Sequence, residues 1–453
     1  MDPQLAALIF ILFIIYLFWT DRKESDRPSN ALWIPLTWMF IAGSRYVGEW
    51  LDLAPPKSAN AYTEGSPVDA AVFFLLIAAG LFILFKRKID WGRVLTQNKW
   101  VWLYFLYCAM SIIWADYSFV SFKRWIKELG NVVMIMVILT EKHPYEAIGV
   151  ILRRLSFLWL PLSVLFIKYY PYLGRSYQRY SGAPMYTGIA GHKNYLGAMC
   201  LLSIIYFSWK YLLNRKERFR FANRGSINDL ILMGMAAWLL DKAQSATSLA
   251  CSVVSVSMFS VSRLAVISQK PGRIIALVTI TFFLGLSLEA TFGVKDTVIE
   301  FLGRNTSLTE RVPMWETLME MGTNPFVGAG FQSFWMGERL EKIWDALGVQ
   351  FTQAHNGYLE QYLNLGYIGV AFIGVILLSG LFKVRNQLEV DYPAAMLRLC
   401  FIIAAVLYNY TEASFYGINN IWLLTLFGIF EISYQKKACD QYGEFISLSK
   451  EWK

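Results

Sequence analysis

The stretch GYIGVAFIGVILLSGL, from Gly366 to Leu381, decides the class of fold. It carries no charged side chain, and its length approaches the ~20 apolar residues with which a helix crosses a hydrocarbon core. Comparable runs recur along the 453-residue chain, which is 56% hydrophobic and 17% charged. Soluble domains contain about 25% charged residues. The sequence therefore predicts an all-α polytopic membrane protein.

Thirteen segments are candidate spans, so about 12–13 transmembrane helices are expected. The first run, Leu5 to Trp19, lacks a basic n-region before it and a small-residue cleavage site, and is therefore interpreted as a span and not as a signal peptide. The candidates are residues 4–19, 31–50, 68–85, 99–115, 129–141, 155–170, 195–213, 228–241, 246–262, 274–291, 366–382, 394–410 and 419–434.

The domain organisation follows from the positions of these runs. We expect residues 1–291 to form a transmembrane bundle of about ten spans. Residues 292–365 form one long segment outside the membrane. Residues 366–453 hold the last spans and a terminal tail.

Basic residues in the short connections predict the orientation. The connections around residues 22–27, 86–93 and 215–224 are rich in Lys and Arg, and all fall on one side of the alternation. Positive charge marks the cytoplasmic side, which the tail shares, so residues 292–365 face outward. The net charge of +9 is attributed to orientation and to anionic lipids, with no nucleic-acid partner.

A second group of cations falls on the outer side, against the usual rule. Such charges suit a polyanionic ligand such as a diphosphate, and the alternative is that these side chains reach the membrane interface without binding anything. The group includes Lys123, Arg124, Lys127, Arg175, Arg179, Lys193, Lys242, Arg304 and Arg311.

The outer segment has helical signals of its own. Ser307-Leu-Thr-Glu310 fits a capping box, and Pro313 falls near the first turn of the helix that follows. Asn324-Pro325 ends that helix, and a second amphipathic helix is expected over 335–347. The segment is thus predicted to be a small helical cap on the membrane bundle.

His355 and Arg311 are the candidate catalytic residues of this cap. A histidine where polar sequence meets an apolar run can act as a general base while facing water, although a lone histidine at a helix start is often only a polar residue. Arg311, at a helix N-terminus, suits an anion. Alternatively, it pairs with Glu310 or Glu316. No second ligand lies at metal-binding spacing, so no metal is expected.

Two further polar segments are expected on the outer side. Arg175 to Tyr180, followed by Gly191 to Gly197, offers contacts for phosphate and sugar, or is simply a flexible connector. Asp241 to Thr247 places Lys242 either at a cavity within the membrane or at the interface. The five cysteines, Cys108, Cys200, Cys251, Cys400 and Cys439, show no disulfide or metal pattern and are interpreted mainly as small buried residues.

Four motifs in order, over roughly residues 190–370, resemble those of O-antigen ligases and Wzy-type polysaccharide polymerases. His355-Asn356 precedes Gly366-x-x-Gly369, and the segment from Ser307 to Trp315 is similar to a Ser-Leu-Thr-Gly-Arg…Trp motif. Gly328-Ala-Gly330-x-x-x-Phe334 matches the glycine turn that follows. Gly191-His-Lys-Asn-x-Leu-Gly197 resembles most closely the succinoglycan-polymerase branch.

The resemblance implies a GT-C-like glycosyltransferase of the bacterial inner membrane, with its active site facing the periplasm and without metal or cofactor. Its donor is a glycan on undecaprenyl diphosphate, its acceptor is a sugar hydroxyl, and a chain-length regulator is a further partner. His355 is then the base and Arg311 holds the diphosphate. The residues expected to contact substrate are Arg175, Arg179, His192, Lys193, Asn194, Lys242, Arg304 and Asn356.

One departure and several alternatives stay open. Many ligases carry a second essential arginine where this chain reads Ser245-Ala-Thr247, and Lys242, Arg175 or Arg179 can supply that charge. The leading hypothesis is a polymerase, and the nearest rival is a ligase that transfers the glycan to lipid A core. A lipid-linked oligosaccharide transporter is less favoured, because repeated halves and paired broken helices are not evident. A non-catalytic scaffold has no need for a histidine and an arginine on one outer cap.

Overall fold

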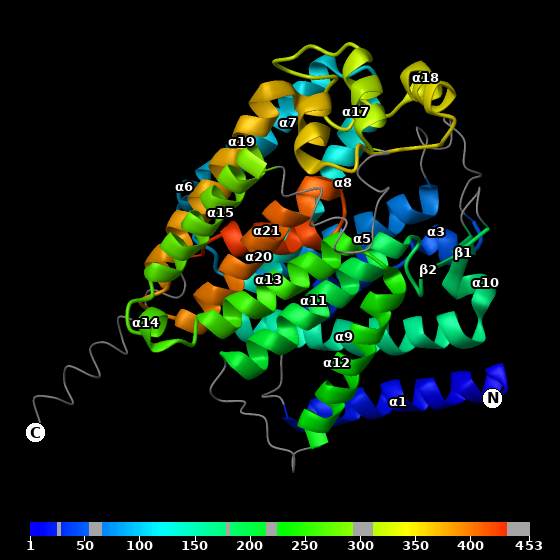
Figure 1. Ribbon diagram of the computed structural model, residues 1–453, viewed down its shortest axis with the longest axis vertical. Helices are drawn as coiled ribbons and strands as arrows, with labels where there is room; N and C mark the ends of the chain where they lie inside the picture. Colours follow the sequence, from blue (N-terminus) through cyan, green and yellow to red (C-terminus); the bar gives the residue numbers. More distant parts are fainter. Residues whose placement is uncertain (25–28, 54–65, 178–181, 214–223, 293–310, 433–453) are drawn as a thin grey trace, which may run out of the picture.

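A computed structural model of the chain describes residues 1–24, 29–53, 66–177, 182–213, 224–292 and 311–432 (Figure 1). These residues are mainly helical. Their strands, β1 (Arg175–Tyr177) and β2 (Pro184–Tyr186), form a single antiparallel pair. The predicted all-α class is confirmed for this part of the chain.

Six helices in the described residues are long and apolar enough to cross a membrane. The chain is therefore a multi-pass membrane protein, as the sequence predicts. The six are α1 (Pro3–Glu24), α5 (Pro67–Lys86), α9 (Pro144–Tyr169), α11 (Lys193–Leu212), α19 (Gly357–Gln387) and α20 (Tyr392–Thr411).

The other predicted spans also overlap helices, with different bounds. Segment 31–50 breaks after Gly43, and segment 129–141 is the second half of a 22-residue helix, α8 (Ser118–Leu139). Length and hydropathy thus support six spans, and the count of twelve to thirteen stays a prediction. The shorter apolar helices are α2 (Trp33–Gly43), α7 (Lys99–Met110), α13 (Ala246–Val261) and α21 (Asn420–Ile429).

The remaining helices connect or flank the apolar ones. Several start at a side-chain cap, as at α6, where Asp90 accepts the Arg93 N–H at 3.1 Å. They are η1 (Asn30–Leu32), α3 (Val47–Trp50), α6 (Trp91–Gln97), η2 (Ser111–Trp114), α10 (Pro171–Gly174), α12 (Arg224–Ala243), α14 (Ala265–Ser268), α15 (Arg273–Phe292), α17 (Arg311–Glu320) and α18 (Gly337–Leu347).

Burial separates the central helices from the peripheral ones. In the most apolar windows of α9, α11 and α20, 78%, 72% and 72% of the residues are buried, against 17% in α1 and 22% in α5. A helix that is apolar all round and buried belongs to the core, and α1 lies at the edge of the bundle (Figure 1). The exposed apolar side chains of α1 and α5 are therefore available to lipid.

The cysteines belong to this apolar interior. Cys108, Cys200, Cys251 and Cys400 are buried, and none of these four described cysteines forms a disulfide. Their predicted role as small buried residues is confirmed, and Cys439 lies outside the described residues.

α19 is broken at Gly366, where the sequence turns apolar. Gly366 has φ of +65°, and a Cβ there would lie 2.1 Å from the carbonyl carbon of Phe326. The backbone that follows α17 lies against this break, where Tyr367 donates its N–H to the Pro325 carbonyl at 2.9 Å. A glycine at this position thus allows close approach of two backbones.

A second hydrophobic cluster, separate from the main core, lies under α17 and α18. It contains Met314 and Leu318 of α17, Leu340 and Ile343 of α18, and Leu363 of α19. The predicted helix over 335–347 corresponds to α18, which begins two residues later. The predicted capping box at 307–310 lies outside the described residues.

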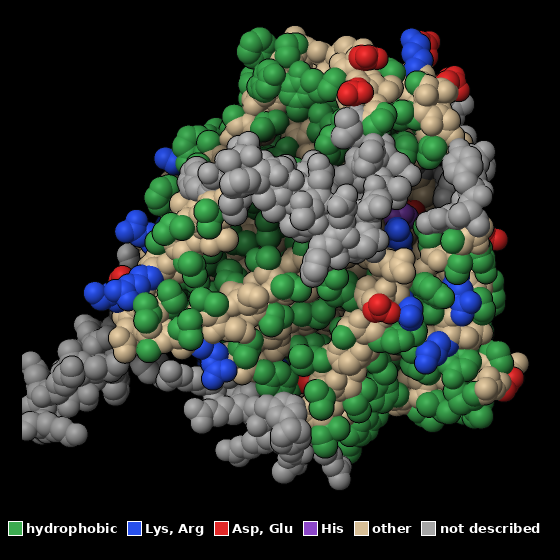
Figure 2. Space-filling model, in the orientation of Figure 1, with side chains coloured by type: hydrophobic (Ala, Val, Ile, Leu, Met, Phe, Trp, Pro, Cys, Tyr) green, Lys and Arg blue, Asp and Glu red, His purple; other side chains and the backbone are tan. Residues whose placement is uncertain are grey.

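The surface distribution of charge fits a chain surrounded by lipid. Figure 2 shows hydrophobic side chains over much of the visible face, with Lys and Arg side chains gathered toward its two sides. Apolar surface flanked by basic and polar residues is typical of a membrane-spanning bundle.

Candidate functional site

The carboxylate of Glu412 joins three segments that lie far apart in the sequence. Glu412 follows the last residue of α20, and its side chain is 8% exposed. Oε2 lies 3.2 Å from His355 Nδ1, and Oε1 accepts from Arg311 Nη2 at 3.2 Å and from Asn194 Nδ2 at 2.7 Å. The candidate base, the candidate anion-binding arginine and one predicted substrate contact therefore converge on one side chain.

The charges of this cluster explain the ionisation of Glu412. Burial alone raises the pKa of the Glu412 carboxyl, but the hydrogen bond and charge of His355 and the charge of Arg311 outweigh burial. They hold the pKa below its ordinary value of 4.5. Glu412 is therefore an anion at neutral pH, despite lying at the negative end of the α20 dipole.

Arg311 is held by two acceptors at the end of α20. Nη1 donates to the Thr411 carbonyl and Nη2 to Glu412. A cation is favourable at a helix C-terminus, where carbonyl groups lack helical partners. Among the described residues, the carboxylate partner of Arg311 is thus Glu412, 101 residues away, and not Glu316. Glu310, the other residue that the local alternative named, lies outside the described residues.

The bond to Glu412 defines the tautomer of His355. An ionised carboxylate accepts hydrogen bonds and donates none, so the proton in this contact belongs to Nδ1. A neutral His355 then carries its lone pair on Nε2, which takes no part in the bond. With 16% of the side chain exposed, the ring combines a fixed orientation with access to its surroundings. This arrangement suits a general base.

His192, Lys193 and Asn194 form the start of α11. His192 is the N-cap residue, and its Nδ1 accepts the Asn194 N–H at 3.2 Å. The Asn194 side chain in turn donates to Glu412. The Lys193 side chain is partly buried. The positive end of α11 is thereby directed at the Glu412 carboxylate.

Asn356 caps the next helix and borders a groove. Its Oδ1 accepts the N–H groups of Tyr358 and Leu359, each at 3.0 Å. The groove has a volume of about 510 Å³. Its walls come from α17 and the start of α19, and its lining residues are Trp315, Glu316, Met319, Asn356, Tyr358 and Leu359.

Other predicted site residues make contacts elsewhere. Arg175 donates twice to the Ile167 carbonyl at the end of α9, at 3.0 and 2.8 Å. Lys242 pairs with Asp241 at 3.1 Å and lies 5.9 Å from the centroid of the Trp238 ring. None of these contacts involves Glu412. Arg179 and Arg304 lie outside the described residues.

The segment Ser245-Ala-Thr247, where many ligases have an arginine, lies beside the cluster. Ser245 caps α13, and the Thr247 hydroxyl bonds the hydroxyl of Thr411, the neighbour of Glu412. A neutral hydroxyl therefore occupies this place, bonded to the residue that precedes Glu412.

Glu412 is not among the site residues predicted from the sequence. Its signal was a single carboxylate in the short connection between two apolar runs, 394–410 and 419–434. Ionisable groups at membrane boundaries are costly and are usually paired. Its partners His355, Arg311 and Asn194 could not be predicted from the local sequence, because they lie 57, 101 and 218 residues away.

The cluster has one carboxylate, and its other polar groups are nitrogen donors. Among the described residues, no group of three or more His, Cys, Asp or Glu side chains is placed to hold a metal ion. No protein-family model matches the chain, and no curated protein matches it.

Proposed function

We propose that the protein is a metal-independent glycosyltransferase that polymerises oligosaccharide repeat units carried on undecaprenyl diphosphate. The observation that carries the proposal is the Glu412 carboxylate, which contacts both His355 and Arg311 at 3.2 Å. A base and a cation held together suit a reaction in which a hydroxyl loses its proton while a diphosphate departs. The four sequence motifs described above support the same reaction by resemblance.

In the proposed step, His355 Nε2 takes the proton of an acceptor sugar hydroxyl. The hydroxyl oxygen forms a bond to the anomeric carbon of the donor glycan. The bond from that carbon to the diphosphate oxygen breaks, and the diphosphate leaves with the electron pair. Glu412 holds the imidazole in orientation and stabilises the imidazolium that forms, as a carboxylate does beside a catalytic histidine.

Arg311 is proposed to bind the diphosphate. A guanidinium has five N–H donors, and its bonds to Thr411 and Glu412 leave N–H groups able to bind phosphate oxygens. Because arginine stays protonated, it can stabilise the negative charge of the leaving group without a metal ion.

The groove beside Asn356 is proposed to receive a sugar of the donor or the acceptor. Its volume of about 510 Å³ falls within the range of small-molecule sites. Asn356 lies directly after His355 in the chain, and Trp315 lies one helical turn after Arg311. A sugar in the groove is thereby close to both proposed catalytic residues.

The proposed location is the bacterial inner membrane, with this site on the periplasmic side. The support comes from the basic connections at 22–27, 86–93 and 215–224, which fall on the opposite side of the predicted alternation. Undecaprenyl-linked repeat units would then reach the site from the outer leaflet.

The test uses purified protein, lipid-linked repeat units and analysis of product length. We expect His355→Ala and Arg311→Ala each to abolish long polymer while the amount of inserted protein stays normal. The matched controls are His143→Ala and Arg93→Ala, whose side chains are exposed and lie away from the cluster. Polymer of wild-type length from the His355 and Arg311 variants would overturn the proposal.

The product also separates a polymerase from a ligase. Extension on undecaprenyl diphosphate supports polymerisation, whereas transfer to lipid A core supports ligation. EDTA tests the metal-free mechanism, and activity lost with EDTA and restored by a divalent ion would contradict it.

A further inference from the structure

His355 has an unusual backbone conformation. Its φ is +49°, in the left-handed region, which few residues other than glycine adopt. Such a conformation persists only where the surrounding structure holds it. The contacts of the residues on either side of His355 therefore hold it in this conformation.

Ala354, directly before His355, is held through both of its backbone polar groups. Its N–H donates to Glu360 Oε2 at 2.8 Å, and its carbonyl accepts from Trp315 Nε1 at 2.8 Å. Ala354 is fully buried. On the other side, Asn356 Nδ2 donates to the Tyr410 carbonyl at 3.3 Å. The backbone is thus fixed immediately before and after the imidazole.

Glu360 is a buried carboxylate that accepts from several neutral groups. It is 1% exposed. Besides Ala354, it accepts from Trp335 Nε1 at 2.7 Å and from Asn364 Nδ2 at 3.0 Å, both on Oε1. A glutamine here would turn an NH₂ group toward one of these donors, whereas both side-chain oxygens of Glu360 accept.

The next residue, Gln361, holds the other half of the cluster. Gln361 Nε2 donates to the Phe415 carbonyl at 3.0 Å, in the connection that begins with Glu412. That connection is fixed again at Gly417, whose N–H donates to Glu128 Oε2 at 2.8 Å and whose carbonyl accepts from Asn131 Nδ2 at 2.9 Å. The position of Glu412 is therefore set by α8 and α19 together.

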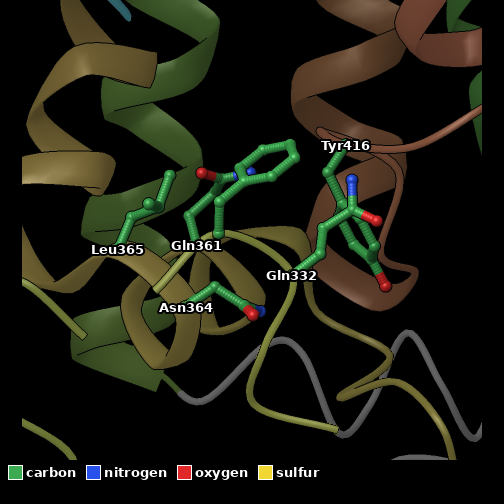
Figure 3. Close-up of a pocket in the computed structure, with 6 residues that line it drawn as sticks. Gln332, Gln361, Asn364, Leu365 and Tyr416 are labelled. Atoms are coloured by element: carbon green, nitrogen blue, oxygen red, sulfur yellow. The ribbon is translucent and has the colours of Figure 1, made fainter. Parts of the chain in front are cut away.

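Figure 3 shows Gln361, Asn364, Gln332 and Tyr416 around a small cavity between these segments. Its volume of about 10 Å³ is near the least that holds one water molecule. The interior is thus filled almost completely, and a displacement of one segment displaces its neighbours.

We propose that Glu360 and Gln361 are positioning residues that fix His355 and Glu412 relative to each other. Glu360 holds the chain that carries His355, and Gln361 holds the chain that carries Glu412. The inference rests on the proposed function, because it assigns these residues to the geometry of the proposed base and its carboxylate partner.

The test is a double-mutant cycle of Glu360→Gln and Glu412→Gln in the purified protein, followed by initial rates of polymerisation. We expect Glu360→Gln alone to lower kcat roughly 10-fold with KM for the lipid-linked substrate unchanged, because Arg311 and the groove are retained. The loss in the double variant should be smaller than the product of the two single losses, since both changes act on the same pair of side chains.

The matched control is Asp229→Asn, another buried carboxylate. Asp229 is 3% exposed and accepts from Lys210 at 2.8 Å, far along the chain from His355. We expect this variant to lose thermal stability, keep kcat and show no coupling to Glu412→Gln. If Glu360→Gln fails to fold, Trp335→Phe replaces it, because this change removes one donor to Glu360. We expect a smaller loss of kcat from Trp335→Phe, and this loss should again combine less than multiplicatively with that of Glu412→Gln.

The outcomes distinguish the two proposals. Losses from Glu360→Gln and Glu412→Gln that multiply in the double variant would overturn the positioning role and leave the glycosyltransferase proposal intact. If Glu412→Gln and His355→Ala retain full activity, the proposed function fails as well.

Discussion

Replacing Glu412 by glutamine keeps the size of the side chain and removes the charge that His355 and Arg311 share. Donors lie on both oxygens of Glu412, so the NH₂ group of a glutamine would face one of them, and the imidazolium formed in the proposed step loses its counter-charge. We expect the transfer rate to fall roughly 10²-fold or more. Initial rates at equal amounts of folded protein measure this effect, and a rate equal to that of the wild type would contradict it.

The same variant gives a pH prediction, because the pKa of Glu412 is held below 4.5 in the folded protein. A depressed carboxyl pKa stabilises the fold fully above the ordinary value, and this stabilisation is lost as the pH falls through the lower folded value. The stability difference between the wild type and Glu412→Gln should therefore be fully present at about pH 5, just above the ordinary value. The difference should shrink below pH 4.5. A difference that stays constant down to about pH 3 would rule out this ionisation.

At the scale of elements, the break in α19 depends on Gly366. Gly366→Ala adds a Cβ at a φ of +65°, 2.1 Å from the backbone of Phe326. The chain after α17 cannot stay in place beside such an atom, so we expect a clear fall in the thermal midpoint of the detergent-solubilised protein. Tryptophan fluorescence measures that midpoint, since Trp315 and Trp335 belong to the hydrophobic cluster that contains Leu363, three residues before Gly366.

Gly374→Ala is the matched control, because it lies in the same helix with open space around its Cβ position. Alanine favours helix over glycine by roughly 1 kcal/mol in an exposed helix interior, so its midpoint should equal that of the wild type or exceed it. Equal midpoints for the Gly366 and Gly374 variants would contradict the role given to the break.

The elements that hydropathy predicted well are the long apolar ones. α5, α11 and α20 each lie within three residues of their predicted bounds. α8 was found only in its second half, because Lys123, Arg124 and Lys127 interrupt the apolar pattern of the first half. Amphipathic α18 was predicted almost to its ends, since its pattern is local and Gly348 ends it in a left-handed conformation.

The candidate site was predictable only in part, for a reason that also lies in the elements. His355 and Arg311 each have a local signal, at a polar boundary and at a helix start. Glu412 has only a weak signal, as a single carboxylate between two apolar runs, because its importance comes from partners that the packing of α11, α17, α19 and α20 brings together. Glu360 has no signal that singles it out, since its donors are neutral groups. Conversely, Arg175 has a conspicuous local pattern, and its donors are used to hold the end of α9.

For the whole molecule, the proposed reaction requires the His355 cluster and the basic connections to lie on opposite sides of the membrane. α18 packs in the same hydrophobic cluster as Ala354, which directly precedes His355. α6 contains part of the basic stretch 86–93. The described cysteines are buried, so a chain with Cys439→Ser should react weakly with a thiol reagent. New cysteines on these two helices can therefore report their side.

We expect Lys342→Cys in α18 to react with a membrane-impermeant maleimide in intact spheroplasts, and Arg93→Cys in α6 to react only after the membrane is opened. Both side chains are exposed, so a lack of reaction reflects the membrane and not burial. The Cys439→Ser chain without a new cysteine measures the background. If Arg93→Cys reacts in intact spheroplasts and Lys342→Cys does not, the orientation is inverted. The His355 cluster would then face the cytoplasm, where the proposed transfer on the periplasmic side cannot take place.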